Sequence, residues 1–446
     1  MVKDDLKTGS FHRAFQVGKL GLGITGSYLG YQMQNWFLDP ESREKKRKAF
    51  HQKSGRRIRQ ELQSLRGPVM KLGQALSMQT QWVPEEAIEE LAELQTRAPS
   101  MHPTLMRTQF KQSLGKYPEE VFARFDREPF AAASLGQVHY AVTRAGEEAA
   151  VKIQYPAIRE AVKNDFALLR SVTWPARLAN YVTLDMLEEI ERGIMLETDY
   201  LQEARNIEFF RDGLKELPYM RVPRVLKEYS TEKVLTMSFM KGEFLDAWLQ
   251  SHPGQADRDR LGARLFELFF YQFLQLTTLH ADPHPGNYLY DADGCISLID
   301  FGCVKHLSSR ILNYIRGFSE RPWETDEAKF IAVLNSVFGG RIDPARKKDK
   351  RLIQAVIQFN DTLLPRRNED PRVDFGRPTV LNRMFQAWNA VSRHNAPDPE
   401  FFFLCRTELG LCNTLYKLGA RVNTVEIADR AQYFPKMDVL VPSRAG

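Results

Sequence analysis

The stretch HADPHPGN, residues 280–287, decides how the rest of the chain is interpreted. It holds two histidines, an aspartate and an asparagine, but also two prolines and a glycine. The stretch is therefore compatible with three interpretations: a cluster of metal ligands, a surface turn, or the rim of an active site. His280 and His284 stand four residues apart in a proline-containing stretch, so no helix face unites them as metal ligands. We expect His280 to be a buried, structural hydrogen-bonding residue.

The next segment, NYLYDADGCISLIDFG, predicts a hairpin with two short strands, NYLY and SLID, joined by DADG. DADG is compatible with a type I′ turn. Asn287 and Asp300 then lie at opposite ends of one hairpin, where an amide oxygen and a carboxylate can converge. A kinase-type site needs one aspartate to orient the acceptor and an Asn/Asp pair to hold Mg²⁺. We therefore expect Asp282 to be catalytic, and Asn287 and Asp300 to bind the metal.

Upstream residues supply the remaining parts of this template. The run AAVKIQ places Lys152 on a strand, where it can hold the phosphates of ATP. The segment LETDYLQEARN follows, and we expect it to be a regular helix in which Asp199 and Glu203 share one face. Glu203 is the expected partner of Lys152, whereas Glu197 points elsewhere on such a helix.

The phosphate-covering segment departs from the kinase template. Protein kinases have G-x-G-x-x-G there, but this chain has PFAAASLGQVH. The methyl group of alanine removes the freedom to adopt positive φ that glycine gives. We expect a stiffer cover for ATP, formed by these residues: Ala131, Ala132, Ala133, Ser134 and Gln137.

Five motifs in this order resemble the UbiB/ADCK family of atypical protein-kinase-like ATPases. They are K-x-G-Q (Lys71 to Gln74), the alanine-rich segment, E-x-D (Glu197 to Asp199), HADPHPGN and LIDFG. The resemblance runs from about residue 55 to 305 and returns weakly at residues 406–423. It implies that the K-x-G-Q helices fold over the cleft, and that Lys71 acts in catalysis and reaches the acids of E-x-D. By the same resemblance, Gln74, Glu197 and Asp199 are regulatory.

The order of elements predicts an α+β, bilobal protein-kinase-like fold with a small β-rich N-lobe and a mostly helical C-lobe. An N-terminal helical extension is expected to pack over the cleft. Strands are expected at VFARF, GQVHYAV, AAVKIQ and KVLTMSFM, with helices between about 157 and 212. The Phe-rich run FELFFYQFLQL fits a core helix rather than a cofactor site. The expected domains are a membrane-proximal segment (1–40), the K-x-G-Q extension (41–118), the N-lobe (119–240) and the C-lobe (241–446).

Charge is concentrated near the amino terminus. Residues 41–60 hold nine Lys/Arg and two Glu, and this excess accounts for the whole formal charge of +6. The preceding Leu20–Leu38 stretch is uncharged, but its glycines and polar residues make it a poor membrane span. It fits a helix on an anionic membrane surface, a partner-binding helix, or a helix packed on the protein body. We expect no nucleic-acid partner, no signal peptide, and a cytoplasmic protein with peripheral attachment at the inner membrane face.

Three functions remain open. The first is a Mg²⁺-dependent ATPase with suppressed protein-kinase activity; by family resemblance it supports isoprenoid-lipid metabolism of the ubiquinone type. The second is a small-molecule phosphotransferase, because Ala281 replaces the arginine with which regulated kinases bind a phosphorylated activation loop. The third is a nucleotide-gated scaffold of a lipid-biosynthetic complex. ATP and Mg²⁺ are the expected cofactors, and the four separated cysteines fit a reducing compartment.

Overall fold

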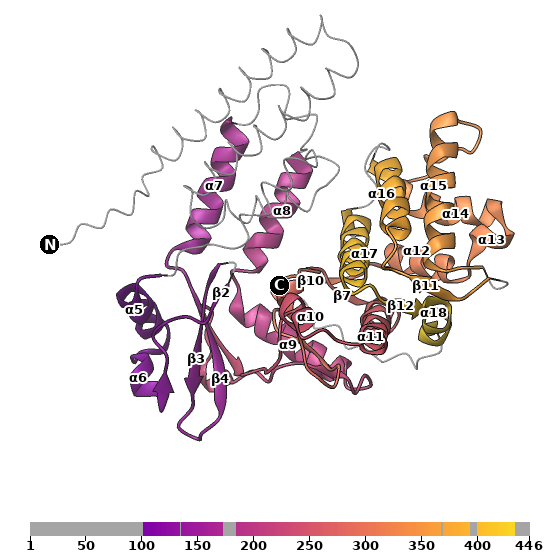
Figure 1. Ribbon diagram of the computed structural model, residues 1–446. Helices are drawn as coiled ribbons and strands as arrows, with labels where there is room; N and C mark the ends of the chain where they lie inside the picture. Colours follow the sequence, from indigo (N-terminus) through magenta and orange to yellow (C-terminus); the bar gives the residue numbers. More distant parts are fainter. Residues whose placement is uncertain (1–100, 134, 173–183, 367–368, 393–398, 433–446) are drawn as a thin grey trace, which may run out of the picture. The chain divides into compact units, whose positions relative to one another are not determined.

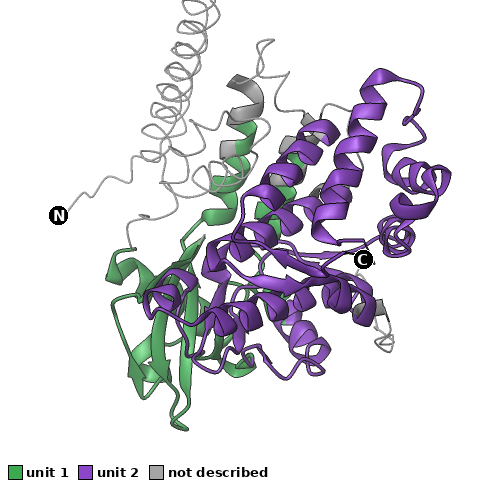
Figure 2. Ribbon diagram, turned by 45° about the vertical axis from the view of Figure 1, so that its right-hand side comes forward, with its two compact units in different colours: residues 1–204, 225–239 green, residues 205–224, 240–446 purple. Residues whose placement is uncertain are grey.

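The computed structural model of this chain describes residues 101–133, 135–172, 184–366, 369–392 and 399–432. The expected membrane-proximal segment, the K-x-G-Q helices and their packing over a cleft all lie outside these residues. The chain divides into two compact units (Figure 2). Unit 1 comprises residues up to Ala204 together with Val225–Phe239, and unit 2 comprises Arg205–Arg224 together with the residues from Met240 onward.

Unit 1 is built on an antiparallel sheet of five strands in the order β1-β3-β4-β6, with β2 paired to the free part of β3. Its helices are visible beside and above this sheet in Figure 1. The strands are β1 (Arg124–Phe125), β2 (Ala131–Ala133), β3 (Gly136–Val142), β4 (Glu148–Gln154) and β6 (Val234–Ser238). The helices are α5 (Pro103–Leu114), α6 (Pro118–Val121), α7 (Ile158–Val172), α8 (Leu184–Leu196), the first residues of α9 (Tyr200–Gly213) and the 3₁₀ turn η3 (Lys227–Tyr229).

The central hairpin β3–β4 forms as the sequence predicts, with Gln137 opposite Ile153 and Val142 opposite Glu148. Strand β4 is buried on both faces, which explains its nearly continuous apolar sequence. Gly136 is required at the start of β3, because a Cβ there would lie 2.2 Å from the carbonyl oxygen of Ile153. Helix α5 packs its buried Met106 and Phe110 against this sheet.

The expected strand VFARF is wrong in its first half. Pro118–Val121 forms the short helix α6, and only Arg124–Phe125 pairs with β3. Pro118 at the first helical position and the Glu120 carboxylate, which accepts a hydrogen bond from the Tyr117 amide at 2.7 Å, favour this helical turn. A local helix-start signal therefore overrides the β-type pattern.

The helical region after β4 is confirmed within the described residues, but it is not one regular helix near E-x-D. Helix α8 ends at Leu196, and α9 begins at Tyr200. The Asp199 carboxylate accepts a hydrogen bond from the Gln202 amide at 2.9 Å, the usual arrangement of an N-cap. Glu197 and Asp199 therefore lie in the connection, and Asp199 does not share a helix face with Glu203 as expected.

Unit 2 is mostly helical, with short two- and three-stranded sheets. Its helices are the rest of α9, α10 (Leu245–Gln250), α11 (Gln255–Leu274), α12 (Ser309–Ser319), α13 (Pro322–Thr325), α14 (Glu327–Phe338), α15 (Lys347–Leu363), α16 (Thr379–Ser392), α17 (Pro399–Leu418) and α18 (Thr424–Gln432). Its strands are β5 (Met220–Arg221), β7 (Thr278–His280), β8 (Tyr288–Tyr290), β9 (Ile296–Leu298), β10 (Val304–His306), β11 (Arg372–Asp374) and β12 (Arg421–Asn423), with the 3₁₀ turn η4 (Pro285–Asn287). The α+β, kinase-like fold with a helix-rich C-terminal part is confirmed.

The predicted hairpin is β8–β9, with Tyr288 opposite Leu298. Its turn is not type I′, because among residues 291–294 only Gly294 has a positive φ, of 74°. The Gly294 amide donates to the Asp291 carbonyl at 3.0 Å, and the Asp291 amide donates to Cys295 at 3.2 Å. This is a three-residue hairpin loop in which glycine takes the left-handed position after the turn.

Three strand pairs in unit 2 were not expected. Strand β7 pairs with β10, β11 pairs with β12, and β5 pairs in parallel with β9. The strands that the sequence analysis missed have two or three residues each, too few for a periodic signal. The Phe-rich run lies in α11 and contributes many core residues, as predicted. No helix in the described ranges is long and apolar enough to cross a membrane.

Candidate active site

Unit 1 holds a buried ion pair between its sheet and helix α9. The Lys152 ammonium on β4 lies 2.8 and 2.9 Å from the two carboxylate oxygens of Glu203. Their side chains are only 7% and 1% exposed, and the ammonium lies 5.2 Å from the centre of the Tyr200 ring. The expected pairing of Lys152 with Glu203 is therefore present. Because desolvation offsets most of the attraction in such a pair, the pair is weak evidence for a gain in stability.

The alanine-rich segment is an extended strand rather than an irregular loop. Ala131 lies opposite Val138 and Ala133 opposite Gly136, so the segment forms ladder hydrogen bonds with β3. Ala132 is exposed, and its two neighbours are half-buried. Alanine suits this extended backbone, which does not need positive φ. Ser134 lies outside the described residues, and contact of these alanines with ATP stays a prediction.

Gln137 is buried at 1% exposure. Its side-chain oxygen accepts a hydrogen bond from the Met101 amide at 2.7 Å, and its nitrogen lies 2.8 Å from Nε2 of His139. These contacts commit the Gln137 side chain to the interior of unit 1. Contact of Gln137 with ATP stays a prediction. Because the side chain is already used, such a contact would be made mainly by the Gln137 backbone.

The E-x-D residues occupy the break between α8 and α9. The carbonyl of Thr198, between the two acids, accepts a hydrogen bond from the Gln154 side chain at 2.7 Å, which ties this break to the end of β4. Glu197 and Asp199 are both half-buried. Lys71 and Gln74, which were expected to act with them, lie outside the described residues.

In unit 2, the HADPHPGN segment brings Asp282 and Asn287 together. The Asn287 side-chain nitrogen donates to the Asp282 carboxylate at 3.0 Å and to its carbonyl at 3.1 Å. The 3₁₀ turn η4 begins after His284, whose Nδ1 accepts from the Gly286 amide at 3.0 Å. His284 therefore stabilises the turn, and the turn orients Asn287 toward Asp282.

His280 connects this segment to the backbone of Asp300. Its Nε2 lies 2.6 Å from the Asp300 carbonyl, so Nε2 carries the proton and donates. The side chain of Gln272 accepts a hydrogen bond from the His280 amide at 2.7 Å, and the imidazole is 1% exposed. The expected structural role of His280 is confirmed. The Asp300 carboxylate accepts a hydrogen bond from the Gly302 amide at 3.0 Å.

Asn287 precedes the first strand of the hairpin and Asp300 follows the second, and the pairing of the two strands brings these positions close together, as expected. The Ile299 amide donates to the Asn287 carbonyl at 3.0 Å, so residues 287 and 299 are neighbours across β8 and β9. Since the Asn287 nitrogen is used by Asp282, its side-chain oxygen is left as an acceptor. Within the described ranges, no cluster of three or more His, Cys, Asp or Glu could hold a metal alone. One amide and one carboxylate oxygen suit Mg²⁺ that takes its other ligands from phosphates and water.

Arg406 is a site residue that sequence reasoning missed. Its guanidinium lies 3.0 Å from the second carboxylate oxygen of Asp282, and the two side chains are 20% and 26% exposed. One turn further along α17, Gly410 packs against Pro283, where a Cβ would lie 2.1 Å from the proline ring. The hints in the sequence were the weak return of the family resemblance at residues 406–423 and the charged residues within the apolar run FFFLCRTELGLC. Helix α17 thus supports the segment that carries Asp282.

A family model, the ABC1 atypical kinase-like domain, matches residues 93–334, which is more than half of the chain. This chain belongs to the ABC1 atypical kinase-like family. A Pseudomonas aeruginosa relative, named "Probable protein kinase UbiB", is 33% identical over 379 residues, covering 81% of this chain and 68% of that protein. The resemblance to the UbiB/ADCK family is thereby confirmed.

Other family members differ in length and setting. An Arabidopsis thaliana protein, "ACTIVITY OF BC1 COMPLEX KINASE 7, chloroplastic", is 32% identical over 270 residues, which cover 60% of this chain and 39% of that protein. This chain therefore spans about two fifths of the plant relative. A solved structure of Rv3197 with erythromycin, from Mycobacterium tuberculosis, matches with a TM-score of 0.57 and 26% identity, covering 83% of this chain and 94% of that one.

Proposed function

We propose that this chain binds ATP with Mg²⁺ and hydrolyses it slowly, without efficient transfer to protein substrates. The buried Lys152–Glu203 ion pair carries the proposal, because phosphoryl transfer of the kinase type needs a lysine held in this way. A hydrogen-bonded ammonium that is largely shielded from water is suited to the α- and β-phosphates. The hairpin that brings Asn287 next to position 299 supports the metal part of the proposal.

The other residues have separate roles in this proposal. Asn287 and Asp300 would hold the magnesium ion, which when bound neutralises charge on the phosphates. Asp282 orients the attacking water or acceptor hydroxyl, and its carboxylate is held by Asn287 on one oxygen and Arg406 on the other. Gly302 and His280 hold Asp300 through its carboxylate and its carbonyl. The chemistry is mainly positioning and charge stabilisation, as phosphoryl transfer requires.

The biological setting is proposed from the family. Suppression of protein-kinase activity rests on the K-x-G-Q motif, and a role in isoprenoid-lipid metabolism rests on the UbiB relatives. The basic stretch at residues 41–60 supports a peripheral contact with anionic membranes. A small-molecule acceptor is the second candidate, favoured by Ala281, whose buried methyl stands where regulated kinases carry an arginine.

The test is thermal unfolding of the full chain with ATP or ADP, with and without Mg²⁺, followed by phosphate release. We expect Mg²⁺-dependent stabilisation by nucleotide, and we expect Asp300→Asn to lose phosphate release. Asp293→Asn is the matched control, because Asp293 lies exposed in the loop of the same hairpin. A wild-type protein without a Mg²⁺-dependent shift, or an Asp300→Asn variant with unchanged phosphate release, contradicts the proposal.

A further inference from the structure

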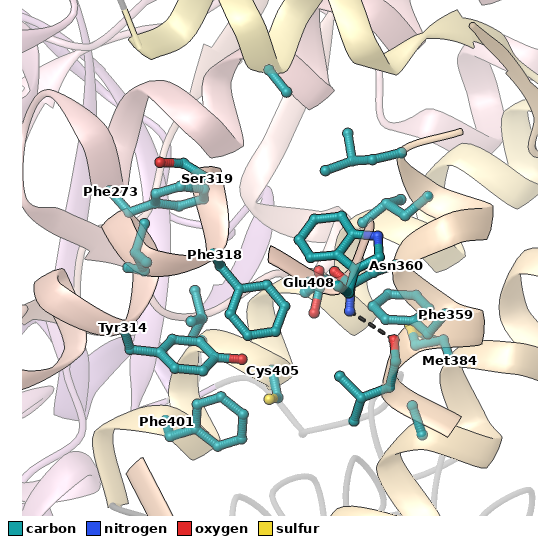
Figure 3. Close-up of a pocket in the computed structure, with 18 of the residues that line it drawn as sticks. Phe273, Tyr314, Phe318, Ser319, Phe359, Asn360, Met384, Phe401, Cys405 and Glu408 are labelled. Atoms are coloured by element: carbon teal, nitrogen blue, oxygen red, sulfur yellow. Dashed lines mark hydrogen bonds between the residues drawn. The ribbon is translucent and has the colours of Figure 1, made fainter. Parts of the chain in front are cut away.

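Unit 2 contains a cavity of about 150 Å³ that the proposed chemistry does not use. Side chains from helices α11 to α18 line it, with Phe273, Tyr314, Phe318, Phe359 and Phe401 among the rings around it (Figure 3). Protein interiors are close-packed, and voids much larger than a water molecule are few. A cavity of this size in an apolar site can hold a benzene-sized molecule.

One carboxylate lies among these apolar side chains. Glu408 on α17 lines the cavity, and Figure 3 shows its carboxylate between the aromatic rings. Within the part of the chain that the structure describes, this carboxylate makes no hydrogen bond or ion pair. Burial raises its pKa from 4.5 to about 7. Glu408 is half-buried, and an ionised group that is partly shielded from water and has no protein partner would gain a strong contact from a ligand that supplied a charged donor.

The charge balance of the lining favours a cation. Asp429 on α18 adds a second carboxylate, whereas the cationic member of the described lining is Arg321. Arg321 is already committed: its guanidinium donates to the carbonyls of Leu364 and Pro365 at 2.5 and 2.6 Å and pairs with Glu324 at 2.7 Å. The cavity therefore presents acid that the surrounding protein does not neutralise.

We propose that this cavity binds a small molecule with an aromatic or cyclic apolar body and one protonated amine, which pairs with Glu408. The aromatic lining accepts the body of the ligand, and the carboxylate accepts its N–H groups. The volume limits the enclosed part of the ligand to about one ring. This site is distinct from the residues assigned to ATP and Mg²⁺.

Helix α17 connects the cavity to the residues assigned to catalysis. Cys405, Glu408 and Leu409 lie at helical spacing and line the cavity. Arg406 and Gly410 are also one turn apart, and they contact Asp282 and Pro283. A ligand that moves this helix would therefore move the residue that holds Asp282.

The experiment uses benzylamine as the probe and toluene as its neutral counterpart, titrated into the full chain at about pH 8 with ligand-observed NMR. Wild type should bind benzylamine at least about tenfold more tightly than toluene, since a hydrogen bond to a charged group is worth 1.5–3 kcal/mol. Glu408→Gln keeps the shape of the side chain and should lose this preference while still binding toluene. Ala387→Leu fills the cavity from α16 and should weaken both probes.

Several results would overturn the proposal. The proposal is contradicted if folded wild type fails to bind benzylamine or binds both probes equally well. A folded Glu408→Gln variant that keeps the preference for benzylamine contradicts it as well. Binding that survives in folded Ala387→Leu would place the probe elsewhere on the protein. Circular dichroism spectra establish that each variant is folded, and the two variants lie on different helices, so failure of one to fold leaves the other as the test.

Discussion

Breaking the Lys152–Glu203 ion pair should lower the free energy of unfolding of unit 1. Glu203→Gln removes the charge that faces the Lys152 ammonium at 2.8 and 2.9 Å, in a place where both side chains are less than a tenth exposed. The buried Lys152 ammonium then no longer faces the charge of the Glu203 carboxylate. Removing one partner of a buried pair typically costs 3–5 kcal/mol, so we expect unit 1 to lose about 3 to 5 kcal/mol of stability.

The matched comparison is the double variant Lys152→Met/Glu203→Leu. It removes both charges and keeps apolar volume, and buried pairs replaced in this way are often neutral or stabilising. The double variant should therefore be more stable than Glu203→Gln, while both should lose ATP binding. A second control is Arg127→Gln, which breaks the ion pair between Arg127 and Glu119. The side chains of these two residues are 63% and 35% exposed, so the variant should lose less than about 1 kcal/mol of stability.

The assay must report on unit 1. The described tryptophans, Trp248, Trp323 and Trp388, all belong to unit 2, so their fluorescence follows the wrong part of the chain. Amide hydrogen exchange of β4 and α9 measures local stability directly. A loss of less than about 1 kcal/mol in Glu203→Gln, or a double variant as unstable as the single one, would refute the reasoning that this pair is a desolvated functional contact.

Three further predictions concern other parts of the chain. Arg406→Ala should lower kcat for ATP hydrolysis by about tenfold with little change in KM, because Arg406 positions Asp282. The variant should stay folded, since the Arg406–Asp282 pair is too exposed to contribute more than about 1 kcal/mol to stability. Arg406→Lys should restore part of kcat. Between about pH 5 and pH 8 wild type should lose up to roughly 3 kcal/mol of stability that Glu408→Gln does not lose, as urea unfolding followed by tryptophan fluorescence would show. The sign follows because burial raises the pKa of Glu408 from 4.5 to about 7, so its stabilisation is complete below 4.5 and is lost as pH rises through 7. Deletion of residues 1–60 should reduce co-sedimentation with anionic vesicles, at roughly 1 kcal/mol per basic residue near the surface.

Each of these has a contrary outcome. An Arg406→Ala variant that changes KM alone would mean that Arg406 acts on nucleotide binding rather than on Asp282. Parallel pH profiles for wild type and Glu408→Gln would show that the carboxylate is solvated. Equal pelleting of the deleted and full chains, with neutral vesicles as the control, would assign the basic stretch to the protein body.

The site residues that lie close together in sequence were predictable. Asp282 and Asn287 are five residues apart in a turn shaped by proline and glycine, and Asn287 and Asp300 are joined by one short hairpin, so local spacing places them. Lys152 follows from a strand pattern. Its pairing with Glu203 followed from the kinase template, although the helix expected around E-x-D is in fact broken at Asp199, whose side chain caps α9.

The sequence by itself determined the α+β fold and the order of the motifs, because turn residues and periodicity act over a few residues. The family followed from the resemblance of those motifs. Only the tertiary structure decided that Arg406, 124 residues from Asp282, holds its carboxylate, and that Glu408 faces a cavity. Such contacts depend on how helices distant in sequence pack together. Packing depends on the shape of many side chains at once, and no spacing within one segment encodes it.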